Sequence, residues 1–300
     1  MKQSIRLYII PTYKNSHATN SYIFDKENEN TLDIVWLDNA LTELKNEYNI
    51  LQTEICGGEI TSLSDFYFNM LFHLIQINCN KIIVSTDFID FNKSMINYCD
   101  IINVKYNFNG YSKNKDIVYS NIKAAVSEGK IINIKSLDIS CKVNSRAIID
   151  DLNKLRIKSW EIVPYHQSIY SKAKAMNYHD YEELIKQYLF LVKTMKFAFQ
   201  NKLQLDGILP IDNYNVKNIY ITPNNKFAVT EFDKDNKFKL CECDDLSSLQ
   251  KKIREMENLR DNFCYNCDSK LRCLANRLIN LNYIGESCSG FKDLIKYYDK

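Results

Sequence analysis

The first half of the chain alternates short β-rich runs with helix-like stretches, and this alternation is the feature that most restricts its fold. Each run rich in Ile and Val is followed by a longer segment with apolar residues at helical spacing, and then by the next run. Strands separated by helices of ten or more residues lie parallel in one sheet. The sequence therefore predicts an α/β fold in which about six βα units form a partial parallel barrel, rather than a complete eight-stranded barrel.

Local signals set the expected ends of these elements. Pro11 and Pro164 end strand-like runs, and Ser64 and Ser145 stand where helix N-caps are expected. The expected strands are residues 5–10, 49–56, 81–85, 101–106, 130–134, 137–143 and 159–163, and the expected helices are residues 36–48, 66–77, 116–128, 145–155 and 178–199.

The pattern changes after residue 205. Two β-rich runs, residues 218–222 and 227–232, flank the turn-forming sequence Pro-Asn-Asn-Lys, which predicts a β-hairpin. A short strand and a charged helix are expected to follow, over residues 237–241 and 245–258. We therefore expect a βα domain over residues 1–205 and a smaller module over residues 206–300.

The smaller module contains four cysteines with the spacing of metal ligands. Cys264, Cys267 and Cys273 form a C-x2-C-x5-C pattern, and Cys288 follows fifteen residues later. A two-residue insertion lets the backbone curl so that both flanking sulfurs point to one metal. Four thiolates suit either a tetrahedral zinc ion or an iron–sulfur cluster, and the spacing alone leaves both open.

Charge and hydropathy argue against several kinds of partner. A formal net charge of +2 gives no basis for binding nucleic acid or an anionic membrane. No secretory signal and no apolar run of membrane-spanning length is recognised, so we expect a cytoplasmic protein. In that reducing compartment, cysteines serve metal binding or the core rather than disulfides. The cysteines expected in the core are Cys56, Cys79, Cys99 and Cys141.

Gly57-Gly58-Glu59 follows the second expected strand and resembles the glycine-glycine-glutamate motif of radical S-adenosylmethionine (SAM) enzymes. In that family the motif receives the amino group of SAM. The hairpin and the terminal cysteines resemble the SPASM extension, a module that holds auxiliary iron–sulfur clusters in the same family. The resemblance covers nearly the whole chain, and it implies a radical-SAM-like partial barrel followed by a SPASM-like module.

The chain departs from this family at the cluster that would generate the radical. The family places a C-x3-C-x2-C loop after the first strand, and that pattern falls here on Asn15, Thr19 and Tyr22. An amide, an alcohol and a phenol are poor ligands for iron–sulfide corners. The resemblance therefore implies lost cluster positions at these residues and a vestigial SAM pocket at Gly57, Gly58 and Glu59, with SAM not expected as a cofactor.

The SPASM-like part departs from the family as well. Ligand positions of the first auxiliary cluster correspond to Asn225, Thr230 and Arg277, none of which is a thiol. The ligands of the second cluster are all retained, and the resemblance implies one structural [4Fe–4S] cluster there, with zinc as an aerobic substitute. Its ligands would be Cys264, Cys267, Cys273 and Cys288.

These departures favour a pseudoenzyme. The resemblance implies a catalytically inactive radical-SAM-like protein that takes part in the modification of a ribosomally made peptide. Its expected partners are the precursor peptide, an active radical SAM maturase, or both. The alternative is a radical-SAM-derived enzyme with changed, non-radical chemistry in the old SAM cavity.

Overall fold

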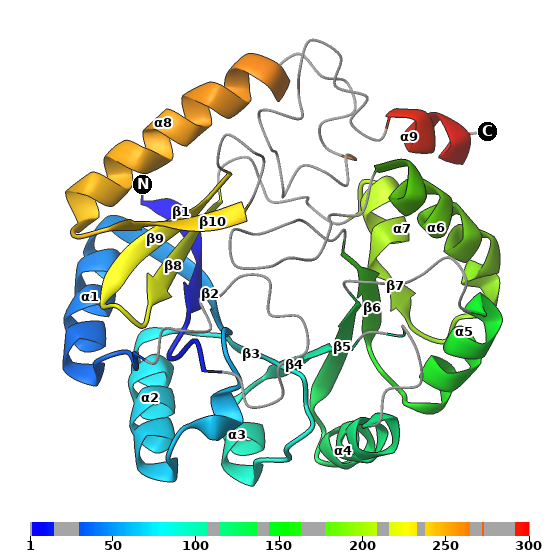
Figure 1. Ribbon diagram of the computed structural model, residues 1–300, viewed down its shortest axis with the longest axis horizontal. Helices are drawn as coiled ribbons and strands as arrows, with labels where there is room; N and C mark the ends of the chain where they lie inside the picture. The colour runs from blue at the N-terminus through cyan, green and yellow to red at the C-terminus, as the bar shows by residue number, and fades with distance from the viewer. Residues whose placement is uncertain are drawn as a thin grey trace.

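The computed structural model describes residues 2–14, 30–106, 108, 114–136, 144–163, 178–208, 216–232, 238–264, 272 and 292–299. Ten strands form a single sheet in the order β10-β9-β8-β1-β2-β3-β4-β5-β6-β7. Figure 1 shows the strands along an arc, with helices α1 to α6 around its outer side. The order is open at β10 and β7, so the sheet is a partial barrel within an α/β fold, as the sequence predicts.

The first six strands confirm the predicted βα units. Each pairs in parallel with the next along the chain. Their bounds are β1 Gln3–Ile9, β2 Tyr48–Ile55, β3 Ile82–Thr86, β4 Ile101–Lys105, β5 Ile131–Ser136 and β6 Ser159–Ile162. The helices between and after them are α1 Ile34–Glu47, α2 Asp65–Asn78, α3 Lys93–Tyr98, α4 Lys115–Ser127, α5 Ser145–Lys154, α6 Tyr178–Leu191 and α7 Gln200–Leu205.

The expected helix over residues 178–199 is too long. Helix α6 ends at Leu191, the 3-10 turn Val192–Thr194 follows, and Ala198–Phe199 form the short strand β7. The Phe199 ring packs 5.5 Å from the Trp160 ring, and Ala198 N donates to Lys158 O at 3.1 Å. Pairing with β6 and aromatic packing thus override the local helical pattern, because propensity is a weak prior beside tertiary contacts.

Two helix caps were predicted, and one of them was wrong. Ser64 caps α2, since its hydroxyl accepts from Tyr67 N at 3.3 Å. Helix α5 is capped by Asn144 rather than Ser145, because the Asn144 side chain accepts from the N–H groups of Arg146 and Ala147. Asn is as good an N-cap as Ser, so residue type does not distinguish these two adjacent residues, and the predicted cap is wrong by one position. The strand expected over residues 137–143 lies outside the described residues.

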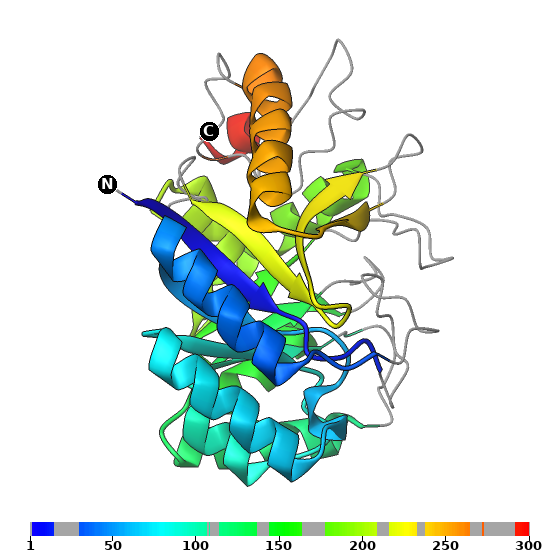
Figure 2. The same cartoon turned by 90° about the vertical axis from the view of Figure 1, so that its left-hand side faces the viewer.

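The second part of the chain extends the same sheet. Strands β8 Lys217–Thr222 and β9 Lys226–Phe232 form the predicted antiparallel hairpin, and β10 Phe238–Cys243 pairs with β9. Strand β8 pairs in parallel with β1, so β1 lies between β2 and β8. The last helices are α8 Leu246–Cys264 and α9 Lys292–Tyr298, and Figures 1 and 2 place both at one end of the molecule.

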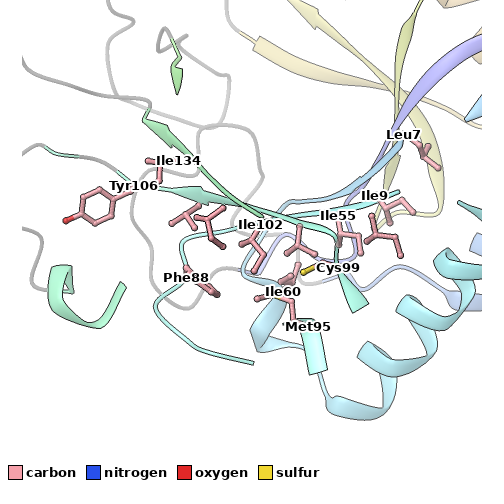
Figure 3. Close-up of a cluster of buried hydrophobic side chains, with 14 of the residues drawn as sticks. Leu7, Ile9, Ile55, Ile60, Phe88, Met95, Cys99, Ile102, Tyr106 and Ile134 are labelled. Atoms are coloured by element: carbon pink, nitrogen blue, oxygen red, sulfur yellow. The ribbon is translucent and has the colours of Figure 1, made fainter. Parts of the chain in front are cut away.

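The main core lies between the sheet and its helices. Ile9, Ile55, Ile102 and Ile134 are fully buried on the outer face of the sheet, toward Phe88 and the helix-side residues seen in Figure 3. Successive side chains of a strand point to opposite faces. The residues directly before and after each of these isoleucines in its strand therefore face the inner side of the arc. Among the described residues, no helix is both long and apolar enough to cross a membrane.

Candidate functional site

The motif Gly57-Gly58-Glu59 prolongs the pairing of β1 and β2 beyond the ends of the strands. Gly58 N donates to Thr12 O, and Glu59 N donates to Lys14 O, each at 2.9 Å. Lys14 is the last described residue before the three positions at which the sequence predicts lost cluster ligands. The motif therefore fixes the backbone from which that loop departs, while Asn15, Thr19 and Tyr22 themselves lie outside the described residues.

Close approach of residues 10–14 explains both glycines. A Cβ at Gly58 would lie 2.0 Å from Lys14 O, and one at Gly57 would lie 2.6 Å from Ile10 Cγ2. Gly57 also has a φ of +126°, which L side chains rarely adopt. The space beside the two glycines is thus filled by the chain's own residues 10–14.

The Glu59 carboxylate is buried and bonded to the loops around it. Its Oε1 accepts from Thr86 Oγ1 at 2.9 Å and from Thr61 Oγ1 at 3.1 Å, and its Oε2 accepts from Asp87 N at 3.3 Å. The side chain also caps the 3-10 turn Ile60–Ser62. These contacts join the loop after β2 to the carboxyl end of β3, so Glu59 orders the loop and caps a short helix.

The structure describes little of the predicted metal site. Cys264 is the last residue of α8, and Cys267, Cys273 and Cys288 lie outside the described residues. No group of three or more His, Cys, Asp or Glu side chains in the described ranges is arranged to hold a metal ion.

Arg272, beside Cys273 in the sequence, is described, and it ties this segment to the rest of the protein. Its guanidinium donates to both carboxylate oxygens of Asp299, at 2.7 and 3.0 Å, and to the Leu205 carbonyl. Asp206, next to Leu205, accepts from Lys202 at 2.6 Å and from the Tyr298 hydroxyl. Arg272 is therefore held against the end of α7 and the residue that follows α9.

Two of the residues that the sequence predicts at ligand positions of a first auxiliary cluster have structural roles in the hairpin. Asn225 lies in its turn with a φ of 57°, and its side chain accepts from Asp33 N at 2.9 Å. Thr230 pairs with Leu240 of β10. Arg277 lies outside the described residues.

Of the cysteines expected in the core, the structure confirms Cys79 and Cys99, whereas the prediction for Cys56 is wrong because it is only partly buried. Cys79 and Cys99 are buried, and burial raises the pKa of Cys99 to about 11. Cys56 is half-buried on the inner face, and desolvation raises the pKa of its thiol to about 12. Such thiols are protonated at neutral pH and are poor nucleophiles. Cys141 lies outside the described residues.

A polar network on the inner face of the sheet was not predicted. Ser85, Asn103, Asn133 and Ser159 form one register row across β3 to β6. Ser159 donates to Asn133 at 2.7 Å, Asn133 donates to Asn103 at 3.2 Å, and Asn103 donates to the Glu54 carboxylate at 3.2 Å. Ser85 donates to the same Glu54 oxygen. The buried Glu54 carboxylate thus accepts directly from β3 and β4, and a chain of hydrogen bonds extends from it to β5 and β6.

Glu54 is ionised although it is buried. Desolvation raises the pKa of its carboxyl, but the Lys135 ammonium, 3.6 Å away, and the hydrogen bonds from Ser85 and Asn103 outweigh burial, and Lys105 adds to them. The net pKa lies below its ordinary value. Opposite charge and hydrogen bonds to the charged form lower a pKa in this way.

A repeated pentapeptide could have revealed this network from the sequence. Strand β4 reads Ile-Ile-Asn-Val-Lys and β5 reads Ile-Ile-Asn-Ile-Lys, and the two run in register. In both strands the Asn and the Lys stand at alternate positions, and the apolar residues between them are buried on the other face. This pattern indicates a polar inner face near the carboxyl ends of β4 and β5. Ligands of open α/β sheets commonly bind at that edge.

An apolar patch borders the polar rows. Ile10 and Tyr13 are buried together, with Cys56, Tyr220 and Leu240 packed against them. Tyr220 also stacks on Tyr8 at 4.7 Å between ring centroids. The inner face therefore presents an aromatic and apolar side at β1 and β8 and a charged side at β4 and β5.

Comparison with known proteins supports the fold. No family model matches the sequence, and no curated protein matches it. The structure is similar to native anSMEcpe with bound AdoMet and Cp18Cys peptide, with a TM-score of 0.70 at 15% identity, covering 99% of this chain and 97% of the other. It is also similar to Escherichia coli HemN, described as a radical SAM enzyme, with a TM-score of 0.53 at 12% identity, covering 95% of this chain and 79% of the other.

A further similar structure is Streptococcus suis SuiB bound to its precursor peptide SuiA. The TM-score is 0.57 at 16% identity, and the match covers 76% of this chain. The chain spans about three fifths of SuiB, 59% of its length. The chain thus shares the fold of these three proteins.

Proposed function

We propose that this chain is a catalytically inactive relative of radical SAM enzymes that binds a peptide during its modification. The bound peptide is the ribosomally made precursor, an active radical SAM maturase is the second candidate partner, and the two can act together. Two proteins of similar fold have peptides bound in their structures, the precursor SuiA in SuiB and the Cp18Cys peptide in anSMEcpe. These likenesses support peptide binding as the function.

The absence of cysteine from the sequence of the loop after β1 carries the proposal of inactivity. The sequence has no cysteine before Cys56. Cys79 and Cys99 are buried on the helix side of the sheet. Among the described residues, three thiolates that could hold a cluster for SAM cleavage are therefore not found beside Gly57 and Gly58, and we derive no radical step for this chain.

The cysteines after α8 are proposed to hold a structural cluster. Four thiols in the spacing C-x2-C-x5-C and a later Cys288 supply the donor set of one [4Fe–4S] cluster. In this proposal residues 206–300 are a SPASM-like module, and ligation of the cluster stabilises its fold.

Anaerobically prepared protein is expected to contain about four iron and four sulfide per chain. Aerobic preparation is expected to give about one zinc instead, because zinc accepts the same four thiolates. Metal analysis measures both. Cys267→Ser should lose most of the metal, whereas Cys241→Ser, at a half-buried thiol outside the group, should retain it. Eight or more irons per chain, or no metal, would contradict a single cluster.

The alternative function is an enzyme with non-radical chemistry. The observation that favours it is the ionised Glu54 with Lys135 at the inner face, because paired charged groups of this kind also occur at active sites. We favour the binding function, since Glu54 already accepts hydrogen bonds from Ser85 and Asn103.

We expect that the protein does not cleave SAM, and this result tests the proposed inactivity. Cluster-loaded protein incubated anaerobically with dithionite and SAM should give no 5′-deoxyadenosine above a no-protein control, because a cluster with four cysteine ligands has no open iron. An active radical SAM enzyme in the same assay is the positive control, and liquid chromatography measures the product. Stoichiometric 5′-deoxyadenosine would refute the pseudoenzyme.

A cysteine-restored variant extends this test. Asn15→Cys, Thr19→Cys and Tyr22→Cys together return the three thiols of the family pattern. Uptake of a second cluster, measured as a doubling of iron per chain, is expected if only the ligands were lost. If the wild type consumes SAM without dithionite, and the triple variant consumes it at the same rate, the result would instead favour the alternative, non-radical enzyme.

A further inference from the structure

Helix α2 has a second set of large side chains on the face opposite the core. Its buried residues belong to the main core, and they are Phe68, Leu71, Phe72 and Ile75. The other set is exposed, and we call it the outer stripe of α2: Phe66, Met70, His73 and Ile77. With 3.6 residues per turn, the two sets lie on opposite sides of the helix. Phe66 is 76% exposed and Ile77 is 65% exposed, so the ends of the outer stripe are almost uncovered.

No permanently charged residue interrupts the outer stripe. The sequence contains no Asp, Glu, Lys or Arg from Phe66 to Asn80. Helices α1 and α4 lie on the same outer side of the arc, and they expose charged residues such as Glu43 and Lys123 (Figure 1). A helix with apolar residues on both faces is typical of one that is buried on both faces. The outer stripe is therefore a surface for a protein contact rather than an ordinary solvated helix face.

The spacing of the outer stripe fits a second copy of the same helix. The steps from Phe66 to Ile77 are four, three and four residues, which is the spacing of the seam between paired helices. The stripe is also symmetric about a midpoint between Met70 and His73. A two-fold axis through this midpoint places Phe66 opposite Ile77 of the second copy, and Met70 opposite His73. The stripe is thus complementary to itself, and it presents no fixed charge that would select a partner of opposite charge.

The start of α1 lies next to this surface. The Tyr67 hydroxyl donates to Leu32 O at 2.6 Å, which brings the first turn of α2 beside the start of α1, where Val35 is exposed. A helix of 14 residues is about 21 Å long. A contact built on one such helix is smaller than the roughly 800 Å² per partner of a standard interface. We therefore expect a reversible association rather than an obligate one.

We propose that two copies of this chain form a two-fold symmetric dimer, in which α2 of one copy packs antiparallel against α2 of the other. The proposal goes beyond peptide binding and does not depend on it. Because α2 lies on the outer side of the arc, the contact does not cover the inner face of either copy (Figure 1).

Sedimentation velocity tests the dimer and its register. The wild type is expected to dimerise with a dissociation constant of about 10 µM. Phe66→Glu and Ile77→Lys each place a charge against an apolar side chain, and each should weaken the dimer about tenfold or more. The double variant pairs these opposite charges at both ends of the seam and should recover most of the affinity. Phe190→Lys, at an exposed phenylalanine near the end of α6, is the matched control for Ile77→Lys and should dimerise like the wild type.

The outcomes distinguish a second copy from another occupant of this face. All variants should stay folded by circular dichroism, because the substituted side chains are exposed. A wild type that is monomeric at about 100 µM overturns the proposal. A dimer that neither single variant weakens, or that the double variant fails to restore, overturns the antiparallel contact through α2. A monomer that binds an active radical SAM maturase, and loses this binding in Phe66→Glu, would assign the face to that protein and overturn the second copy.

Discussion

Gly58→Ala is expected to lower the free energy of unfolding by about 3 kcal/mol or more. The added Cβ would lie 2.0 Å from Lys14 O and 2.7 Å from Tyr13 C, which are backbone atoms that cannot rotate away. Relief requires the separation of residues 12–14 from the motif. That separation would break the hydrogen bonds from Gly58 N and Glu59 N. Urea denaturation followed by circular dichroism measures the change.

Gly129→Ala is the control for this substitution. Gly129 has a φ of +78°, but no atom lies within 4 Å of its Cβ position. An alanine there has only backbone strain, about 1 kcal/mol. A much greater loss is therefore expected at Gly58 than at Gly129. Equal losses at the two positions would contradict the close approach, and so would a Gly58→Ala variant as stable as the wild type.

Glu54→Gln is expected to cost about 2–4 kcal/mol of folding free energy at neutral pH. The substitution removes the charge on which the hydrogen bonds of Ser85 and Asn103 converge, and it removes the carboxylate that lies 3.6 Å from the Lys135 ammonium. Lys135 retains 31% side-chain exposure and can turn toward water, which keeps the cost below that of a fully buried pair. Chemical denaturation measures the difference.

Two controls define the origin of the Glu54 effect. Glu183→Gln removes a carboxylate that is 48% exposed and bonded to Lys186 at 2.7 Å, and it should cost less than about 0.5 kcal/mol. The double variant with Lys135→Met should be less destabilised than the sum of the single variants, because the residues act as a pair. Strict additivity would show that Glu54 and Lys135 are not coupled.

The Glu54 contribution should also depend on pH. The pKa of its carboxyl is lower in the folded protein than its ordinary value of 4.5. A depressed pKa stabilises the fold above the ordinary value, and this stabilisation is lost as the pH falls through the folded-state pKa. The difference between wild type and Glu54→Gln should therefore be full at neutral pH and shrink below about pH 4.5. A difference that stays constant into acid would contradict an ionised Glu54.

The predicted elements depend on local patterns, and the structure bears most of them out. The alternation of β-rich runs and helical segments is sufficient to predict β1 to β6, and the turn at Pro223 is sufficient to predict the hairpin. Strand β7 could not be predicted, because its two residues pair with β6 and pack on Trp160 only in the folded sheet.

The inner network could not be fully predicted either. Glu54, Asn103 and Asn133 come from segments far apart in the sequence, and their contacts depend on the register of three strands. The repeat in β4 and β5 indicates that Asn and Lys share a face. It does not identify the carboxylate on β2 that accepts their hydrogen bonds. The hydrogen bonds of Glu59 could not be predicted either, because its partners Thr86 and Asp87 lie at the end of a different strand, β3, and directly after it.

The central position of β1 has a consequence for the synthesis of this protein. Strand β1 is made first, but one of its two neighbours is β8, and Ile5 pairs with Lys217. At 5–20 residues per second the ribosome needs roughly 10–40 s to make the chain between these partners. During that interval one edge of β1 has no strand to pair with, and an unpaired edge is a template for association with other chains. The nascent protein is therefore most exposed to aggregation just before the hairpin emerges, and a chain truncated ahead of β8 never leaves that state.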